Sequence, residues 1–240
     1  LWHAMGWSRP EWLWIPRRPR RPPPVRSVAR VEPPVQLSAD GPVVIFGGSF
    51  DPPTRAHTTL PPLAAKSIGA SRLVYVPAAV SPHKTNAPPT VANHRLSMLQ
   101  RALADCPGAE IDQREIDRGG VSRTIDTLEL FRSEIDPSIE LRLLIGTDQM
   151  LAFDRWHRWQ DILQVASPLV MVRGDDDVDA AIAEISKIHG PAVAASWLDR
   201  IVQLERMNES STRARASSAS LRDGVCSSVS QYITDNGLYR

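Results

Sequence analysis

The chain has 240 residues, of which 42% are hydrophobic and 23% charged, an ordinary balance for a globular domain with a substantial core. Its formal net charge of +1 argues against the broad basic surface of nucleic-acid-binding proteins, and no apolar run approaches the ~20 residues needed to cross a bilayer. The two cysteines, Cys106 and Cys226, predict neither a zinc site nor a disulfide framework, so we expect a cytoplasmic protein.

Residues 1–41 differ in composition from the rest of the chain. They hold eight of the 21 prolines, four of the seven tryptophans and seven arginines, and they carry a net charge of +4. Such proline-rich sequence forms neither a helix nor a sheet ladder. We predict a disordered or extended Arg/Pro-rich arm, or translated upstream sequence, followed by one domain over 42–240. A basic arm for nucleic acid or acidic lipid is the alternative.

The segment 43–57 reads Val-Val-Ile-Phe-Gly-Gly-Ser-Phe-Asp-Pro-Pro-Thr-Arg-Ala-His. Its first four residues predict a buried strand, and the two glycines predict a tight turn. A helix is expected over 54–68, with Ser49 and Asp51 as capping candidates and a kink or interruption at Pro61-Pro62. Glycines and helix N–H groups both favour the approach of a phosphate. The pattern is neither the P-loop nor the dinucleotide fingerprint Gly-x-Gly-x-x-Gly.

The rest of the chain alternates strands with helices. Apolar runs predict further strands at 72–77, 110–113, 140–146, 168–172 and 201–204. Helical spacing predicts helices at 92–105, from 124 onward, around Trp156 and Trp159, and at 178–189. This alternation implies βαβ units around a parallel sheet. Ligands of such sheets gather at the carboxyl ends of the strands, which Gly47, Pro77 and Gly146 mark here.

The glycine turn and the tetrad Thr54-Arg55-Ala56-His57 resemble the Gly-Gly-Ser/Thr-Phe-Asp-Pro…His/Thr-x-Gly-His signature of the nucleotidyltransferase superfamily. Thr54 replaces the commoner first His of that signature, and Ala56 replaces its Gly. Further motifs, in the same order, resemble bacterial nicotinate-nucleotide adenylyltransferases: Ser81-Pro82-His83-Lys84, residues 117–128, residues 145–163, residues 210–215 and the Gly237-Leu238-Tyr239 ending. Arg123 stands where that family usually has Tyr. The resemblance, from about 43 to 240, implies an α/β fold: a Rossmann-like parallel sheet flanked by helices, with a small helical C-terminal part.

The resemblance also implies a reaction, the transfer of the adenylyl group of ATP to nicotinate mononucleotide in NAD biosynthesis, with Mg²⁺ bridging the ATP phosphates. Its catalytic residues would be His57, Thr54 and Arg215. The implied ATP-binding residues are Gly47, Gly48, Ser49, Phe50, His57, Asp148, Ser211, Thr212 and Arg215. The implied residues for nicotinate mononucleotide are Ser49, Lys84, Thr124, Trp156 and His157.

Each of these residues also has a plainer interpretation. His57 alone would be an ordinary helix residue, Asp148 a helix cap, Lys84 a solvated charge, and Trp156 a core residue like Trp159. Two other functions stay open: phosphopantetheine adenylyl transfer, and nucleotide binding without turnover by a degenerate member of the superfamily. The expected partners are ATP and the mononucleotide, without membrane or nucleic acid. The sequence leaves open the oligomeric state and the preference between acid and amide mononucleotide.

Overall fold

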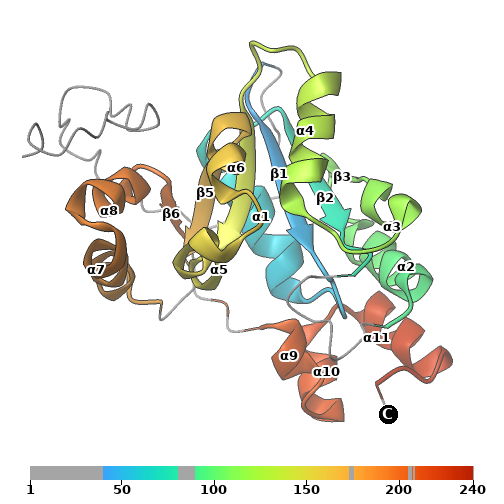
Figure 1. Cartoon of the computed structure of the whole chain (residues 1–240). Coiled ribbons are helices and arrows are strands. Elements are labelled where there is room, and N and C mark those ends of the chain that lie inside the picture. Colours follow the sequence, from blue (N-terminus) through green and yellow to red (C-terminus); the bar gives the residue numbers. More distant parts are fainter. Residues whose placement is uncertain (1–39, 81–89, 173–175, 205–206, 208, 240) are drawn as a thin grey trace, which may run out of the picture.

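The computed structural model describes residues 40–80, 90–172, 176–204, 207 and 209–239 (Figure 1). All but the last two residues of the predicted arm at 1–41 lie outside the described residues, and so does Lys84. Among the helices that the structure describes, none combines the length and the apolar character that a membrane crossing requires.

Six parallel strands form one sheet in the order β3-β2-β1-β4-β5-β6. The strands are β1 (Val43–Gly48), β2 (Arg72–Pro77), β3 (Ala109–Ile111), β4 (Leu141–Gly146), β5 (Ser167–Val172) and β6 (Ile201–Gln203). This confirms the predicted strands and the Rossmann-like parallel sheet. The strand order reverses between β1 and β4, and in open sheets of this kind the crevice beyond that switch point is the usual ligand site.

Helices cover both faces of the sheet. They are α1 (Arg55–Ser67), α2 (Ala92–Leu103), α3 (Arg114–Arg118), α4 (Thr124–Glu134), α5 (Thr147–Leu151), the 3₁₀ turn η1 (Phe153–Arg155), α6 (Trp159–Val165), α7 (Val178–His189), α8 (Pro191–Leu198), α9 (Ser211–Ala214), α10 (Ser218–Gly224) and α11 (Ser227–Asp235). Helices α4 to α8 pack on the face that carries Ile45, and α1 and α2 on the face that carries Phe46. The helices α9 to α11 form the predicted C-terminal part, which packs on α2 around Met98 (Figure 1).

Helix α1 continues through Pro61 and Pro62, so of the predicted kink or interruption the interruption is ruled out. The two prolines lack the N–H groups that would bond the carbonyls of His57 and Thr58 one turn earlier. Each carbonyl receives a side-chain donor instead: the Tyr75 hydroxyl donates to His57 O at 2.9 Å, and the Cys106 thiol to Thr58 O at 3.7 Å. Donors on β2 and in the turn before β3 thus satisfy the carbonyls that the prolines leave unpaired.

Candidate active site

A cavity of about 720 Å³ opens at the switch point of the sheet. Its walls come from the turn after β1, the start of α1, the segment before α4, the ends of β4 and η1, and the segment leading into α9. Residues that are more than 150 positions apart in the chain, such as Gly47 and Ser211, therefore share one space.

Helix α1 begins at Arg55 with Thr54 as its N-cap, so Ser49 and Asp51 do not cap it as predicted. The backbone N–H of Thr54 donates to Nδ1 of His57 at 3.0 Å, and the Thr54 hydroxyl lies 2.7 Å from the same nitrogen. Because a backbone amide can only donate, this Nδ1 carries no proton, and the neutral ring holds its proton on Nε2. Thr54 thereby fixes the tautomer and the direction of an imidazole that lines the cavity.

The turn after β1 places Phe50 in the left-handed region, with φ of 47°. Its ring is buried and lies edge-on to Phe46 and to His57, with centroids 5.6 and 5.4 Å apart. A Cβ on Gly48 would meet this ring at 3.0–3.3 Å, whereas a Cβ on Gly47 would meet nothing within 4 Å. A side chain at Gly48 would therefore crowd the Phe50 ring, whereas one at Gly47 would enter the cavity that this residue lines.

Arg95 of α2 is almost completely buried, with 1% of its surface exposed. Its guanidinium donates to three carbonyls: Thr90 O at 2.8 Å, Ser49 O at 2.8 Å and Ala79 O at 3.0 Å. Burial lowers the pKa of Arg95, and the nearby Asp51 carboxylate opposes this shift. One side chain therefore joins the turn after β1, the end of β2 and the start of α2.

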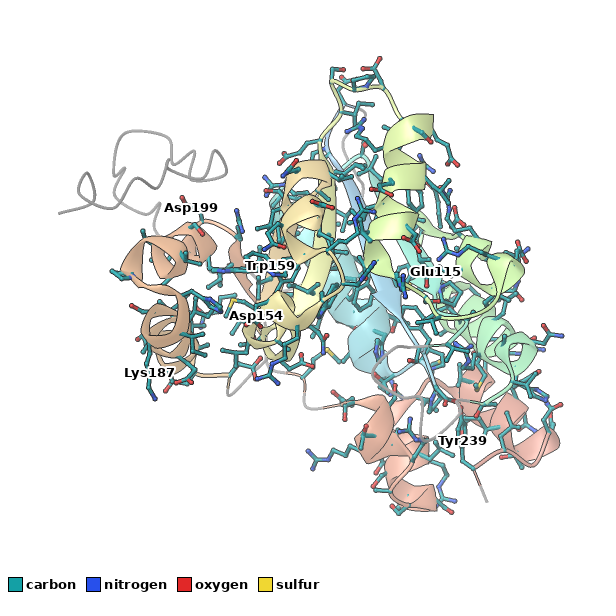
Figure 2. The ribbon with its side chains drawn as sticks, viewed as in Figure 1. Glu115, Asp154, Trp159, Lys187, Asp199 and Tyr239 are labelled. Atoms are coloured by element: carbon teal, nitrogen blue, oxygen red, sulfur yellow. The ribbon has the colours of Figure 1, made fainter. Side chains whose placement is uncertain are left out.

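The C-terminal helices are attached to the same turn. The Tyr239 hydroxyl and the Thr90 N–H both donate to the Asp51 carboxylate. Burial and this hydrogen bond raise the pKa of Tyr239, which Figure 2 shows beside the C-terminal helices. The Ser211 hydroxyl donates to Pro52 O at 2.8 Å, and the Arg215 guanidinium donates to Asp51 O. These bonds place the serine-rich segment opposite the glycine turn.

Another part of the cavity wall lies around the start of α4. Ser122 is buried: its hydroxyl accepts from the Ala79 N–H, and its own N–H donates to Val80 O, both at 2.9 Å. Next to it, Arg123 and Thr124 line the cavity together with Trp156 and His157. The half-buried Trp156 packs on Phe153, with ring centroids 5.3 Å apart.

Glu115 of α3 also lines this wall and is buried. Figure 2 labels it on the side of the molecule that carries α3 and α4. It accepts a hydrogen bond from the Thr127 hydroxyl of α4 at 2.5 Å. On the outer side, Arg114 binds Asp112 at 2.6 Å and Glu134 at 2.9 Å, which joins the two helices again. Helix α4 is therefore held at a fixed distance from α3 and the end of the sheet.

The sequence of this chain is similar to those of known nucleotidyltransferases. Residues 45–217 match the model of the cytidylyltransferase-like family. A relative from Albidiferax ferrireducens, named "probable nicotinate-nucleotide adenylyltransferase", is 36% identical and covers 82% of this chain and 96% of its own length. A relative of the same name from Laribacter hongkongensis is 33% identical, covering 82% and 93%. The chain belongs to the nicotinate-nucleotide adenylyltransferase family.

Solved structures of this family share the fold. Plasmodium falciparum nicotinic acid mononucleotide adenylyltransferase complexed with NaAD has a TM-score of 0.65 at 16% identity, covering 83% of this chain and 97% of its own. A second structure of that enzyme, complexed with APC, has a TM-score of 0.62. The three-layer arrangement around the switch point is thus the arrangement of the family.

Most residues predicted from the family resemblance line the one cavity. These are Gly47, Gly48, Ser49, His57, Thr124, Asp148, Trp156, His157, Ser211 and Thr212. Three others are not among the lining residues: Thr54 orients His57, Phe50 packs beneath the turn, and Arg215 binds the backbone of Asp51. Ala56, the departure from the family glycine, lines the cavity while packing in the same apolar cluster as Leu60.

Sequence reasoning missed Arg95, Glu115 and the link from Tyr239 to Asp51. Arg95 did leave a signal, because it precedes the buried Met98 and Leu99 by three and four positions on one helix face. A charged residue on an apolar stripe indicates a buried network rather than a solvated charge.

The predicted helix around Trp156 is also corrected: Trp156 lies between η1 and α6, and only Trp159 is helical.

Proposed function

We propose that this protein transfers the adenylyl group of ATP to nicotinate mononucleotide, giving deamido-NAD and pyrophosphate. The observation that carries the proposal is that one cavity is lined both by a glycine turn with His57 and by Trp156, which we take as its two ends. ATP phosphates fit the first end, and an electron-poor pyridine ring fits the face of an indole. The names of the relatives support this choice of substrates, and the cytoplasm, which supplies both, is the proposed location.

At the phosphate end, Gly47, Gly48 and Ser49 would admit the triphosphate to the backbone. The hydroxyls of Ser211 and Thr212 would contact its outer phosphates from the opposite wall. Asp148, at the start of α5, would contact the ribose or the base of a bound nucleotide. Arg215 would join the phosphates by exchanging its bond to Asp51 O for a charge-assisted one, and Lys84 is proposed to approach the same groups.

In the proposed reaction an oxygen of the mononucleotide 5′-phosphate attacks the α-phosphorus of ATP. The new phosphorus–oxygen bond forms as the bond to the pyrophosphate oxygen breaks, so the electron pair leaves with pyrophosphate. The nucleophile is already ionised, and no general base is needed. The Nε2–H of His57, set by Thr54, would donate to an α-phosphate oxygen as its charge grows.

Mg²⁺ is proposed to enter as the magnesium complex of ATP. Within the described ranges, no group of three or more His, Cys, Asp or Glu side chains could hold a metal ion. The donor set fits an ion held mainly by phosphates and water, with Glu115 and Asp148 as the carboxylate residues that line the cavity. The ion would supply positive charge to the phosphates as pyrophosphate leaves.

The test is pyrophosphate release from MgATP with three acceptors in parallel: nicotinate mononucleotide, nicotinamide mononucleotide and phosphopantetheine. We expect the nicotinate compound to give the highest kcat/KM and phosphopantetheine to give none above background. Preferred use of phosphopantetheine would move the protein to the other adenylyltransferase class. Nucleotide binding in a calorimeter without turnover of any acceptor would leave only the degenerate binding function.

A further inference from the structure

Arg123 lines the cavity and is exposed. It directly precedes α4, in extended backbone, and its neighbour Ser122 is buried and hydrogen-bonded to the end of β2. The backbone of Arg123 is therefore fixed while its side chain is exposed and lines the cavity. Its NH1 lies 3.4 Å from Nε2 of His157, the residue that follows Trp156. The guanidinium of Arg123 therefore lies on the part of the cavity wall that includes Trp156 and His157.

The charge of Arg123 is not neutralised by any carboxylate in the part of the chain that the structure describes. The contrast is Arg158, one residue beyond His157, which binds Glu129 at 2.8 Å and Asp161 at 2.7 Å. A guanidinium stays protonated and can only donate, so the His157 nitrogen is the acceptor in this contact. A full positive charge therefore faces the cavity at Arg123.

These features select a ligand with a negative charge on or near a flat ring. Trp156 offers the stacking surface, and the Arg123 fork matches the two oxygens of a carboxylate. A carboxamide offers one acceptor oxygen and an NH₂ group that cannot accept, so it cannot form the same paired contact. We infer that Arg123 is a specificity-determining residue, which favours the pyridine carboxylate of the acid mononucleotide over the amide. This inference rests on the proposed function.

The competing contact for Arg123 is the 5′-phosphate, which the acid and the amide mononucleotide share. The two assignments predict different results for one variant. Loss of a carboxylate contact weakens the acid alone, whereas loss of a phosphate contact weakens both mononucleotides equally.

The experiment is therefore kcat/KM for each mononucleotide at saturating MgATP, measured with the wild-type protein and with Arg123→Gln. Where amide turnover is too slow, its Ki as a competitive inhibitor replaces kcat/KM. We expect the acid to lose ~10–100-fold, the usual effect of removing a hydrogen bond to a charged group, with the amide changed by less than about threefold. Arg123→Lys should retain part of the preference, because it keeps the charge and loses the fork.

The matched control is Arg118→Gln, which makes the same change of charge at an exposed residue of α3 outside the cavity. It should leave the acid-to-amide ratio unchanged, and a circular-dichroism melt should show that all variants fold. Equal losses for acid and amide in Arg123→Gln, or no loss for either, would overturn the inference while the proposed function stands. A wild-type protein without turnover of the acid would overturn the proposed function itself.

Discussion

The two ends of the cavity are built in different ways. The proposed phosphate end (Gly47, Gly48, Ser49 and His57) rests on buried groups: Arg95 alone holds three carbonyls, and Thr54 fixes the imidazole. The proposed ring end (Arg123, Thr124, Trp156 and His157) has a fixed backbone but presents exposed arginine and histidine side chains. Substitutions at the first end should therefore cost stability or turnover, and those at the second should change the acceptor.

The largest expected effect is that of Arg95→Met, which keeps the volume but leaves the carbonyls of Ser49, Ala79 and Thr90 without their donor. Each buried group left unsatisfied costs about 1–3 kcal/mol, so we expect the free energy of unfolding to fall by about 3 kcal/mol or more. Urea denaturation measures this loss, and the KM for ATP should rise because Ser49 is released.

The control for Arg95 is Arg101→Met on the same helix. Arg101 is exposed and stacks over the Tyr232 ring at 4.4 Å, a contact worth about 0.5–1 kcal/mol. If both variants lost equal stability, the Arg95 network would not be what holds the phosphate end.

His57→Ala tests the chemistry of the phosphate end. Removing one donor to the developing charge should lower kcat by about 10²–10³-fold, with little change in the KM for ATP. Thr54→Val sharpens this test, because it removes the hydroxyl but keeps the backbone N–H that fixes Nδ1. Its kcat should therefore fall much less, and a loss as large as that of His57→Ala would show that the hydroxyl itself is essential.

Some features of the fold and the site could be predicted from the sequence, and others could not. The parallel sheet follows from the alternation of strand and helix signals, whereas its strand order does not. The phosphate end follows from a local motif, Gly47 to His57, whose residues fold next to one another. The continuous α1 could not be predicted, because the donors that replace the missing proline N–H groups come from Tyr75 and Cys106, distant in the chain. Helix propensities take account of the two prolines but not of hydrogen-bond donors that are distant in the chain.

The supporting residues of the site were equally hidden. Arg95, Glu115 and Tyr239 act through partners 5 to 188 positions away, and only the folded chain brings such partners together. Arg215 shows the converse case. Its motif predicts a phosphate ligand, whereas the structure places its guanidinium on the carbonyl of Asp51. A sequence motif indicates the neighbourhood of a side chain better than it indicates its partner.

Alanine substitutions at the two glycines of the turn distinguish an effect on packing from an effect on ATP binding. Gly48→Ala would bring a Cβ to 3.0–3.3 Å from the packed Phe50 ring, and such overpacking costs about 1–3 kcal/mol of stability. Gly47→Ala meets no protein atom within 4 Å, so the free energy of unfolding should not change. Its methyl group enters ligand space, and the KM for ATP should rise about tenfold. Reversed results, with Gly47→Ala unfolding first, would contradict this division.

The smallest expected effect is at an ion pair between β2 and β3, outside the cavity. It tests whether a loss of stability alone can lower turnover or change the choice of acceptor. Arg72 binds Glu110 with two hydrogen bonds, at 2.8 and 2.6 Å, between β2 and β3. That hydrogen bond, opposed by partial burial, holds the pKa of Glu110 below its ordinary value. The pair therefore stabilises the fold above the unfolded pKa of Glu, about 4.3, and its contribution is lost as the pH falls through the lower folded pKa.

Because both side chains are nearly half exposed, Glu110→Gln should cost no more than about 1 kcal/mol at pH 7. The difference from the wild-type protein should shrink towards zero in urea titrations near pH 3. Turnover and the ratio of acid to amide use should stay unchanged, since neither end of the cavity contacts this pair. A changed ratio in Glu110→Gln would mean that general loosening of the sheet alters acceptor choice, and the separate roles of the two ends would then fail.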